Sequence, residues 1–437
     1  MQLIQQIAFI LFSGAAIFLF RKKILEIRRT ILLGKEMQSG GDTKLRFRNL
    51  MLNAFGQKKM FSNPLVAVLH FFVYAGFIII NIEILEIILD GIMGSHRMFY
   101  PVLGSLYTVL INAFEILAFL VLLACIVFLV RRNIVKVRRL NMGELTEGWP
   151  RKDANIILGF EIVLMTLFLV MNAADYNLQL VQHPHYASTG RFLISGNLAP
   201  WLGSLSENSL VFTERFCWWA HILGIFAFMN YLPYSKHLHV VLAFPNAYYA
   251  PLESKGQMQN MPEIQKEVLY MMQPELAPAD AGAAPMKFGA RDVDDLNRKN
   301  LMDAYSCTEC GRCSAACPAN LTGKKLSPRK IMMATRDRLE DIGRQMAQKT
   351  DWKADGKTLL HDYITVEELR ACTTCNACVQ ECPVSISPLD IILQLRRNLV
   401  MEESNAPQEW NQMFGNIENN MAPWKFSPDD RDAWVHS

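Results

Sequence analysis

The chain has few charged side chains. Asp, Glu, Lys and Arg make up 19% of its 437 residues, whereas 51% are hydrophobic. Mean hydropathy is positive, at +0.13, which is unusual for a soluble protein and indicates membrane segments. The sequence also lacks a glycine-rich nucleotide loop after a predicted strand, and it lacks a nucleophile motif. These absences argue against a terminal enzyme that is complete in this one chain.

Cysteine is scarce outside two short runs, which hold eight of the ten cysteines. Each run reads C-x-x-C-x-x-C-x-x-x-C-P. Three evenly spaced thiolates can bind three corners of a 4Fe-4S cubane, and the fourth, next to proline, is directed to a neighbouring cubane. We therefore predict two 4Fe-4S clusters with crossed ligands: Cys307, Cys310, Cys313 and Cys382 for the first, and Cys372, Cys375, Cys378 and Cys317 for the second.

Zinc or disulfides are the alternative uses of these cysteines. Structural zinc usually takes two C-x-x-C pairs and does not require a third evenly spaced cysteine followed later by C-P. Disulfides are disfavoured where thiols are kept reduced, as in the cytoplasm. The other two cysteines, Cys125 and Cys217, lie in apolar stretches and fit small buried side chains.

Apolar stretches of the length needed to cross a bilayer occur five times. They cover residues 3–20, 64–89, 103–130, 154–175 and 210–232. Connections 21–63 and 131–152 hold eleven and seven Lys or Arg, whereas 90–102 and 176–209 hold one each. Basic residues accumulate on the cytoplasmic side. We predict a multi-pass protein of the cytoplasmic (inner) membrane, with its N-terminus outside and the cysteine runs inside. Basic runs that flank spans are topology signals, so no nucleic-acid partner is expected.

Histidines inside the spans are candidate heme ligands, because ionisable groups in a bilayer are costly and mark function. At ~1.5 Å per residue, His70 lies roughly 10 Å from the inner face and His221 roughly 18 Å from the outer face. These depths nearly coincide in a core of ~30 Å, which predicts heme b between the two rings. His239 is the candidate for a second heme if the helix continues through Pro233, although Met60 occupies the position where its partner would be expected. Hydrogen-bonded buried histidines are the alternative.

Carboxylates in the outer half of the spans are candidates for proton exchange with a quinone, which we expect as a substrate. Glu83 and Glu115 are the two such residues. Pairing with another helix is the alternative for each of them.

The whole chain is predicted to be all-α, with a five-helix transmembrane bundle followed by a cytoplasmic α-helical ferredoxin domain. Apolar runs and caps place the membrane domain at 1–245, an Ala/Pro-rich linker at 246–290 and the cluster domain at 291–400. A short capped helix is expected before the first cysteine run, and helices with Ser or Thr at their starts are expected between the two runs. The polar tail, 401–437, carries tryptophans and is a candidate for partner docking.

The C-terminal half resembles the two-cluster, α-helical ferredoxin subunit of heterodisulfide reductase, in the segments DAYSCTECGRC, ANLTGKKLSP and CTTCNACVQECPV. The membrane half looks like the heme b gamma subunit of respiratory nitrate reductase, in its five spans and in His70, His221 and His239. Proteins of these families carry, or pair with, a unit containing Cys-Cys-Gly. This chain has no Cys-Cys pair, so the resemblance implies a separate cytoplasmic partner, an iron-sulfur subunit of the Cys-Cys-Gly type or a flavin subunit.

Together these features predict an iron-sulfur oxidoreductase subunit that transfers electrons between the quinone pool, heme b, two 4Fe-4S clusters and a cytoplasmic redox partner. The protein's part in such transfer is to fix distance, potential and a dry path. The alternative is a membrane-anchored iron-sulfur sensor or scaffold without heme or quinone activity. These two hypotheses differ in whether a b-type heme is present.

Overall fold

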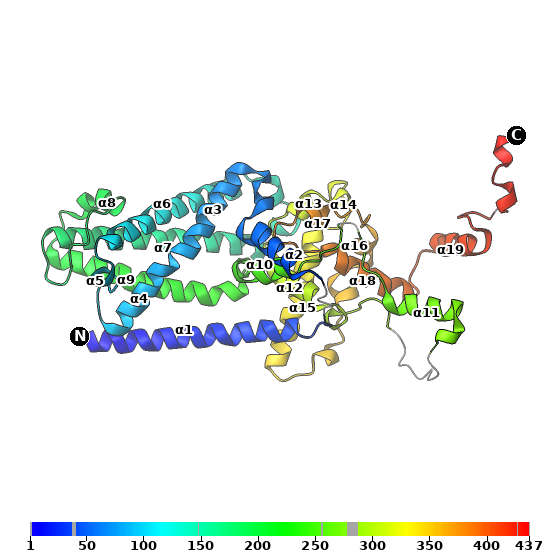
Figure 1. The fold of residues 1–437 in the computed structure, drawn as a ribbon, viewed down its shortest axis with the longest axis horizontal. Coiled ribbons are helices and arrows are strands. Elements are labelled where there is room, and N and C mark those ends of the chain that lie inside the picture. Colours follow the sequence, from blue (N-terminus) through cyan, green and yellow to red (C-terminus); the bar gives the residue numbers. More distant parts are fainter. Residues whose placement is uncertain are drawn as a thin grey trace.

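The computed structural model describes residues 2–36, 41–146, 148–254, 257–277, 287–425 and 427–436. These residues are largely helical and contain no β-strand, which confirms the all-α prediction. Figure 1 shows an elongated helical bundle that meets a smaller helical domain at one end. The N-terminus lies at the end of the bundle far from this domain. The C-terminal tail extends from the domain, away from the bundle.

The bundle contains long helices whose starts follow from local sequence. Asn63 caps α3 by accepting a hydrogen bond from the Val66 amide, and Pro64 occupies the first turn, where its missing N–H costs nothing. Large side chains such as Tyr107, Phe114 and Phe168 fill the centre of the bundle. Its main helices are α1 (Gln2–Ile31), α3 (Pro64–Ile79), α4 (Asn81–Met93), α6 (Ser105–Asn133), α7 (Trp149–Leu180) and α9 (Glu207–Tyr231), with the short α5 (Tyr100–Leu103) and α8 (Ser195–Leu202) at the far end.

Four helical segments in the described residues are long and apolar enough to cross a membrane: Leu3–Ile31, Pro64–Met93, Ser105–Asn133 and Trp149–Leu180. Large apolar side chains such as Leu11, Val109 and Phe212 are exposed on the outside of the bundle, where lipid contact would favour them. The expected fifth span corresponds to α9. That helix packs against α7 but includes Glu214 and Arg215, so a count of five spans stays a prediction.

The C-terminal domain is built from short helices around the cysteine runs. Asn297 and Thr365 form capping boxes at the starts of α12 and α16, and Ser327 caps α15. Helix α12 ends where Cys307 begins the first run, which confirms the expected capped helix before it. The helices are α12 (Arg298–Ser306), α13 (Arg312–Ala315), α14 (Pro318–Leu321), α15 (Pro328–Ala347), α16 (Val366–Arg370), α17 (Ala377–Glu381) and α18 (Pro388–Met401).

The base of the bundle contributes residues to the hydrophobic core of the C-terminal domain. Ile27 of α1 and Leu232, just beyond α9, belong to the same buried cluster as Cys307. The hydroxyls of Thr30 and Tyr305 are 2.9 Å apart across this junction. Because apolar burial is the main stabilising contribution in such contacts, the junction is a packed interface rather than a flexible connection.

The predicted linker and tail both contain helices. The expected boundary at 245 falls inside α10 (His239–Tyr248), which packs against α12. Helix α11 (Pro262–Met272) lies within the predicted linker, and α19 (Gln408–Asn420) lies within the tail. Residues 255–256 and 278–286 of the linker are outside the described residues.

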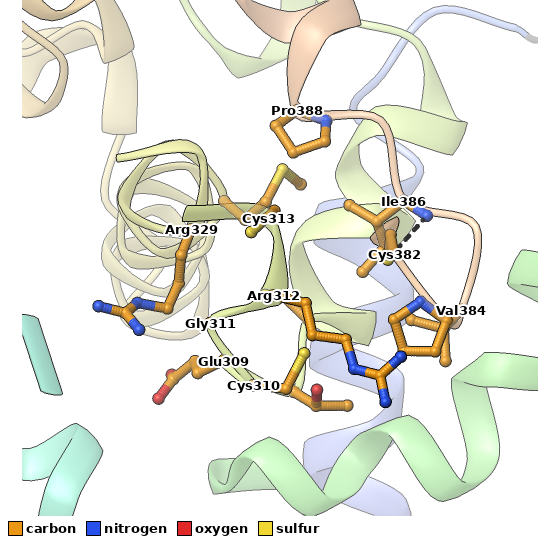
Figure 2. A pocket seen from close by; sticks show the side chains of 14 residues that line it. Glu309, Cys310, Gly311, Arg312, Cys313, Arg329, Cys382, Val384, Ile386 and Pro388 are labelled. Carbon is orange, nitrogen blue, oxygen red and sulfur yellow. Dashed lines mark hydrogen bonds between the residues drawn. The ribbon is translucent and has the colours of Figure 1, made fainter. Parts of the chain in front are cut away.

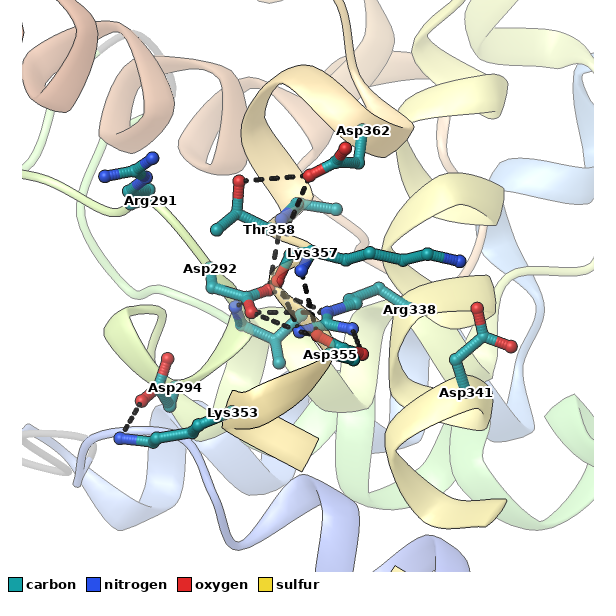
Figure 3. Close-up of polar contacts among 12 residues, drawn as sticks. Arg291, Asp292, Asp294, Arg338, Asp341, Lys353, Asp355, Lys357, Thr358 and Asp362 are labelled. Atoms are coloured by element: carbon teal, nitrogen blue, oxygen red, sulfur yellow. Dashed lines mark hydrogen bonds and ion pairs between the residues drawn. The ribbon is translucent and has the colours of Figure 1, made fainter. Parts of the chain in front are cut away.

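A buried arginine ties α15 to the segments on either side of it in sequence (Figure 3). The Arg338 guanidinium is fully buried and donates to the Asp292 carboxylate at 2.8 Å and to the Asp355 carboxylate at 2.6 Å. It also donates to the Lys357 carbonyl at 2.6 Å, and Asp292 accepts from the Leu359 amide at 3.1 Å. One side chain therefore holds together three segments of the cluster domain.

We expect Arg338→Met to destabilise the protein by about 3–5 kcal/mol, because it leaves two mostly buried carboxylates without their counter-charge. The matched control is Lys353→Met. It removes a largely exposed pair with Asp294, 3.2 Å apart, and should cost about 1 kcal/mol or less. Urea unfolding in detergent, followed by helical circular dichroism, measures both. Equal effects would contradict the role of Arg338.

Candidate metal centres

Two cavities in the C-terminal domain are each lined by four cysteines. Cys307, Cys310, Cys313 and Cys382 line the first cavity (Figure 2). Cys372, Cys375, Cys378 and Cys317 line the second. Each cavity thus takes three cysteines from one run and the fourth from the other. These are the two sets that the cysteine spacing predicted for two clusters.

The two runs follow the same backbone path, although their sequences differ between the cysteines. Glu309 and Thr374 occupy equivalent positions and both have a positive φ, 53° and 56°. Gly311 and Asn376 are also equivalent, with φ values of 74° and 61°. Glycine and asparagine adopt this left-handed conformation most readily. A Cβ at Gly311 would lie 2.5 Å from the Arg139 carbonyl oxygen, so that position also requires glycine for space.

The fourth cysteine of each run is turned away from the other three by the proline that follows it. Cys317 and Cys382 have extended backbones, with ψ values of 119° and 120°, as residues before proline prefer. Helices α13 and α17, which lie between the third and fourth cysteines, pack against each other. Their contact brings each fourth cysteine to the cavity of the opposite run.

The sulfur environment fits an iron-sulfur cluster. Burial raises the pKa of the Cys307 and Cys378 thiols to about 12 and that of Cys382 to about 11, so bare thiolates are unfavourable and a cationic group is needed to hold them deprotonated. Backbone amides of Ile386 and Thr374 donate to the sulfurs of Cys382 and Cys372 at 3.3 and 3.4 Å, as is common around cluster thiolates.

The alternatives raised by the sequence fit less well. All ten cysteines are free thiols, so none is in a disulfide. Among the described residues, no group of three or more His, Cys, Asp or Glu side chains converges to hold a single metal ion. The cysteines surround cavities instead, and this arrangement suits a multi-iron cluster better than a lone zinc ion.

The first cavity lies against the membrane half and is surrounded by ion pairs. The Glu309 carboxylate, in the first run, accepts from Lys236 at 2.7 Å and from Arg336 at 2.5 Å. Burial opposes its ionisation, but these two cations keep the pKa of Glu309 below its usual value. Arg329, which lines the cavity, donates to Glu144, beyond α6, at 2.6 Å. Lys236 and Glu144 both come from connections of the bundle.

The second cavity has a different environment. Its lining includes Leu389 and Ile392 of α18, and Cys375 is exposed. Arg396 donates to the carbonyls of Leu369 and Cys372, both at 2.5 Å, which fixes the start of the second run. The exposed Cys375 gives this cavity a solvent-accessible edge.

The three predicted heme histidines share one hydrogen-bonding pattern. Nδ1 of His70 is 2.9 Å from the Gln57 side-chain oxygen, Nδ1 of His239 is 2.9 Å from the Lys236 carbonyl, and Nδ1 of His221 is 3.0 Å from the Leu164 carbonyl. Carbonyl oxygens only accept, so Nδ1 carries the proton and Nε2 is left with its lone pair. The His221 Nε2 atom is buried and has no hydrogen-bond partner in the described part of the chain. This pattern is typical of metal-ligating histidines.

The predicted heme histidines have different surroundings. His239 and Arg312 are the charged or titratable groups that act on His70, and the His237 ring lies 5.6 Å from that of His239. His221 contacts α7, with its ring 6.0 Å from Phe168. The pairing of His70 with His221 across a heme stays a prediction.

Helix α9 does not continue to His239. The prediction for His239 required a helix that continues through Pro233, but α9 ends at Tyr231. Two short 3-10 turns, Leu232–Tyr234 and Lys236–Leu238, follow before α10 begins at His239. Pro233 was the available signal for this break.

The two candidate carboxylates differ in their partners. Glu115 is fully buried and accepts from the Asn172 side chain at 3.2 Å and from the Ile194 amide at 2.9 Å. Glu83 is also buried, but its Oε2 atom has no hydrogen-bond partner among the described residues. Glu115 therefore has a structural role in its helix contacts, whereas Glu83 has an unused oxygen.

Comparison with known proteins supports the cluster assignment. A family described as a 4Fe-4S dicluster domain matches residues 306–386, and a second family with the same description matches 266–322. The chain is 27% identical, over 98% of its length, to a probable iron-sulfur-binding oxidoreductase, FadF, of Bacillus subtilis. It is 27% identical, over 87% of its length, to the EtfAB:quinone oxidoreductase of Syntrophomonas wolfei.

A shorter match is one subunit of a CoB-CoM heterodisulfide reductase of Methanosarcina acetivorans, 33% identical over 24% of this chain and 53% of that protein. The chain spans 60% of the Bacillus protein and 52% of the Syntrophomonas protein. No solved structure matches the chain significantly. The matches support an iron-sulfur electron-transfer protein with a dicluster domain, which is the class that the two cavities indicate.

We expect Cys317→Ser to perturb the cluster of the second run, although Cys317 belongs to the first run. Cys382→Ser should perturb the cluster of the first run, because each cavity takes its fourth thiolate from the opposite run. Electron paramagnetic resonance of the reduced protein, with iron quantitation against the about eight irons per chain expected for two cubanes, measures both. Damage confined to each variant's own run would refute crossed ligation.

Proposed function

We propose that the chain is a membrane-bound electron-transfer subunit that connects the quinone pool, through heme b and two 4Fe-4S clusters, to a cytoplasmic redox partner. The observation that carries this proposal is the placement of the two cavities. The first is tied to the bundle through the ion pair between Lys236 and Glu309 of its lining, and the second has an exposed edge at Cys375. A chain that relays electrons between a membrane and a soluble protein needs such an arrangement.

Heme b, when bound, supplies a one-electron carrier inside the bundle. His70 and His239 are the residues proposed to hold it, because His239 acts on His70 and the Nδ1 hydrogen bond of each ring leaves Nε2 available. Their Nδ1 partners, Gln57 and the Lys236 carbonyl, fix the ring orientation. His221 also has a free Nε2, but no histidine is among the groups that act on it. The resemblance of the bundle to the nitrate reductase gamma subunit remains a prediction with this heme.

The proposed quinone site lies in the outer half of the bundle near Glu83. A carboxylate can take up or release the protons that accompany quinone chemistry. The Oε2 atom of Glu83 has no hydrogen-bond partner among the described residues. The relative named EtfAB:quinone oxidoreductase also favours a quinone substrate.

The proposed location is the cytoplasmic membrane, with the N-terminus outside and the cluster domain inside. The lysine and arginine asymmetry of the connections supports this orientation. The bundle agrees with it, since the N-terminus lies at the end of the bundle far from the cluster domain (Figure 1).

The proposed partner is a separate cytoplasmic redox subunit, either an iron-sulfur subunit of the Cys-Cys-Gly type or a flavin subunit, and the name of the relative makes EtfAB the candidate to test. We propose that it docks on α19. Trp410, Phe414 and Ile417 are exposed on one face of this helix, none of whose described residues is buried. A 13-residue helix of this kind is marginal in water without packing. Arg370, just before the second cysteine run, holds the base of α19 through Asn405 at 2.7 Å.

The test of the heme is the reduced-minus-oxidised visible spectrum of the protein purified without air. We expect a b-type band that is lost in both His70→Ala and His239→Ala and kept in His221→Ala, because only the first two are proposed as its ligands. Iron quantitation of each variant checks that the clusters remain. Clusters without a heme band in the wild type would instead favour a membrane-anchored iron-sulfur sensor or scaffold.

The test of the docking helix is electron transfer from a purified, reduced EtfAB flavoprotein. We expect the double variant Trp410→Ala, Phe414→Ala to raise the apparent Kd roughly tenfold or more, because aromatic anchors dominate protein interfaces. Reduction of this double variant by dithionite should be the same as that of the wild type. The matched control is Gln412→Ala with Asn419→Ala, on the opposite face of α19, which should transfer like the wild type. Equal affinities for both double variants would exclude docking on the apolar face.

A further inference from the structure

The short segment 57–62 lies between the proposed heme histidine and the first cysteine cavity. Gln57 has a left-handed backbone, with φ 46°, and directly precedes a 3-10 helix over Lys58–Ser62. Asn63 then caps α3, the helix that carries His70. The segment belongs to the bundle, yet its side chains and carbonyls contact residues of both halves.

On one side, the segment contacts His70. The Gln57 side-chain oxygen accepts from Nδ1 of His70 at 2.9 Å. An acceptor at this position fixes the ring and makes Nε2 a stronger electron donor to a bound metal. The left-handed turn at Gln57 is what directs its side chain back toward the start of α3.

On the other side, the segment contacts the loops of the first cavity. The Lys59 ammonium donates to the Cys382 carbonyl at 2.7 Å. Arg312, between Cys310 and Cys313, donates to the Lys59 carbonyl at 2.8 Å and to the Ser62 hydroxyl at 3.3 Å. Both cysteine runs are therefore hydrogen-bonded to the five-residue 3-10 helix Lys58–Ser62.

We propose that residues 57–62 form a positioning bridge, in which Gln57 tunes the carrier held by His70 and Lys59 tunes the cluster held by Cys382. This inference rests on the proposed function, since it requires a heme on His70. The cation of Lys59 stabilises the more negative, reduced form of the nearby cluster, whereas the acceptor at Gln57 stabilises the oxidised heme. Two neighbouring side chains thus act on two carriers independently.

The experiment is a redox titration of the purified full-length protein, followed by visible absorbance for heme and by electron paramagnetic resonance for the clusters. Gln57→Leu removes the acceptor and should shift the heme midpoint potential upward. Gln57→Glu keeps the size, strengthens the acceptor and should shift it downward. A purely structural role would move both variants in the same direction. Neither should shift either cluster.

Lys59→Met should lower the midpoint potential of one cluster, namely the cluster that Cys382→Ser perturbs. It should leave the heme midpoint potential unchanged. The matched control is Lys58→Met, which removes an exposed cation from the same 3-10 helix and should shift neither carrier. In the variant carrying both Gln57→Leu and Lys59→Met, the gap between the heme and cluster midpoint potentials should widen by the sum of the two single shifts.

The outcomes separate this inference from the proposed function. A wild type without a heme band overturns the proposed function and the Gln57 part of the bridge together. If the wild type contains heme, equal heme midpoint potentials in Gln57→Leu and Gln57→Glu overturn the bridge alone. Equal cluster potentials in Lys59→Met and Lys58→Met also overturn it.

Discussion

The sharing of cysteines between two distant runs constrains the whole C-terminal domain. Each cavity needs Cys317 or Cys382 from the opposite run, so neither cavity can form before both loops are in place. That requirement brings α13 against α17 and places the second run beside the start of α14. Iron in the two clusters would supply the positive charge that stabilises the eight thiolates, three of which are buried.

The first cavity also constrains the membrane half. Its loops accept contacts from three connections of the bundle, through Lys59, Glu144 and Lys236. Lys236 serves two purposes, because its ammonium pairs with Glu309 while its carbonyl accepts from His239. The two connections richest in Lys and Arg, 21–63 and 131–152, thus also contact the cluster domain, through the Lys59 ammonium and the Glu144 carboxylate.

Local signals were sufficient for much of the fold and of the candidate cluster site. The spacing of the cysteines defined the same two sets that line the cavities, and capping residues such as Ser327 and Thr365 marked helix starts. Each of these signals lies within a few residues of the feature that it predicts. The fifth span was a less certain prediction, because Glu214 and Arg215 lower the hydropathy of α9 while buried contacts inside the bundle accommodate Glu214.

The grouping of the histidines could not be predicted in the same way, because it depends on how the chain turns after α9. Depth counted along straight helices placed His70 level with His221 and left His239 without a partner at Met60. In the structure the chain breaks at Pro233 and α10 begins at His239, whose charge acts on His70. This arrangement also places the proposed heme ligands at the cluster end of the bundle, where Arg312 acts on His70. The same break therefore sets the heme ligands and their closeness to the first cavity.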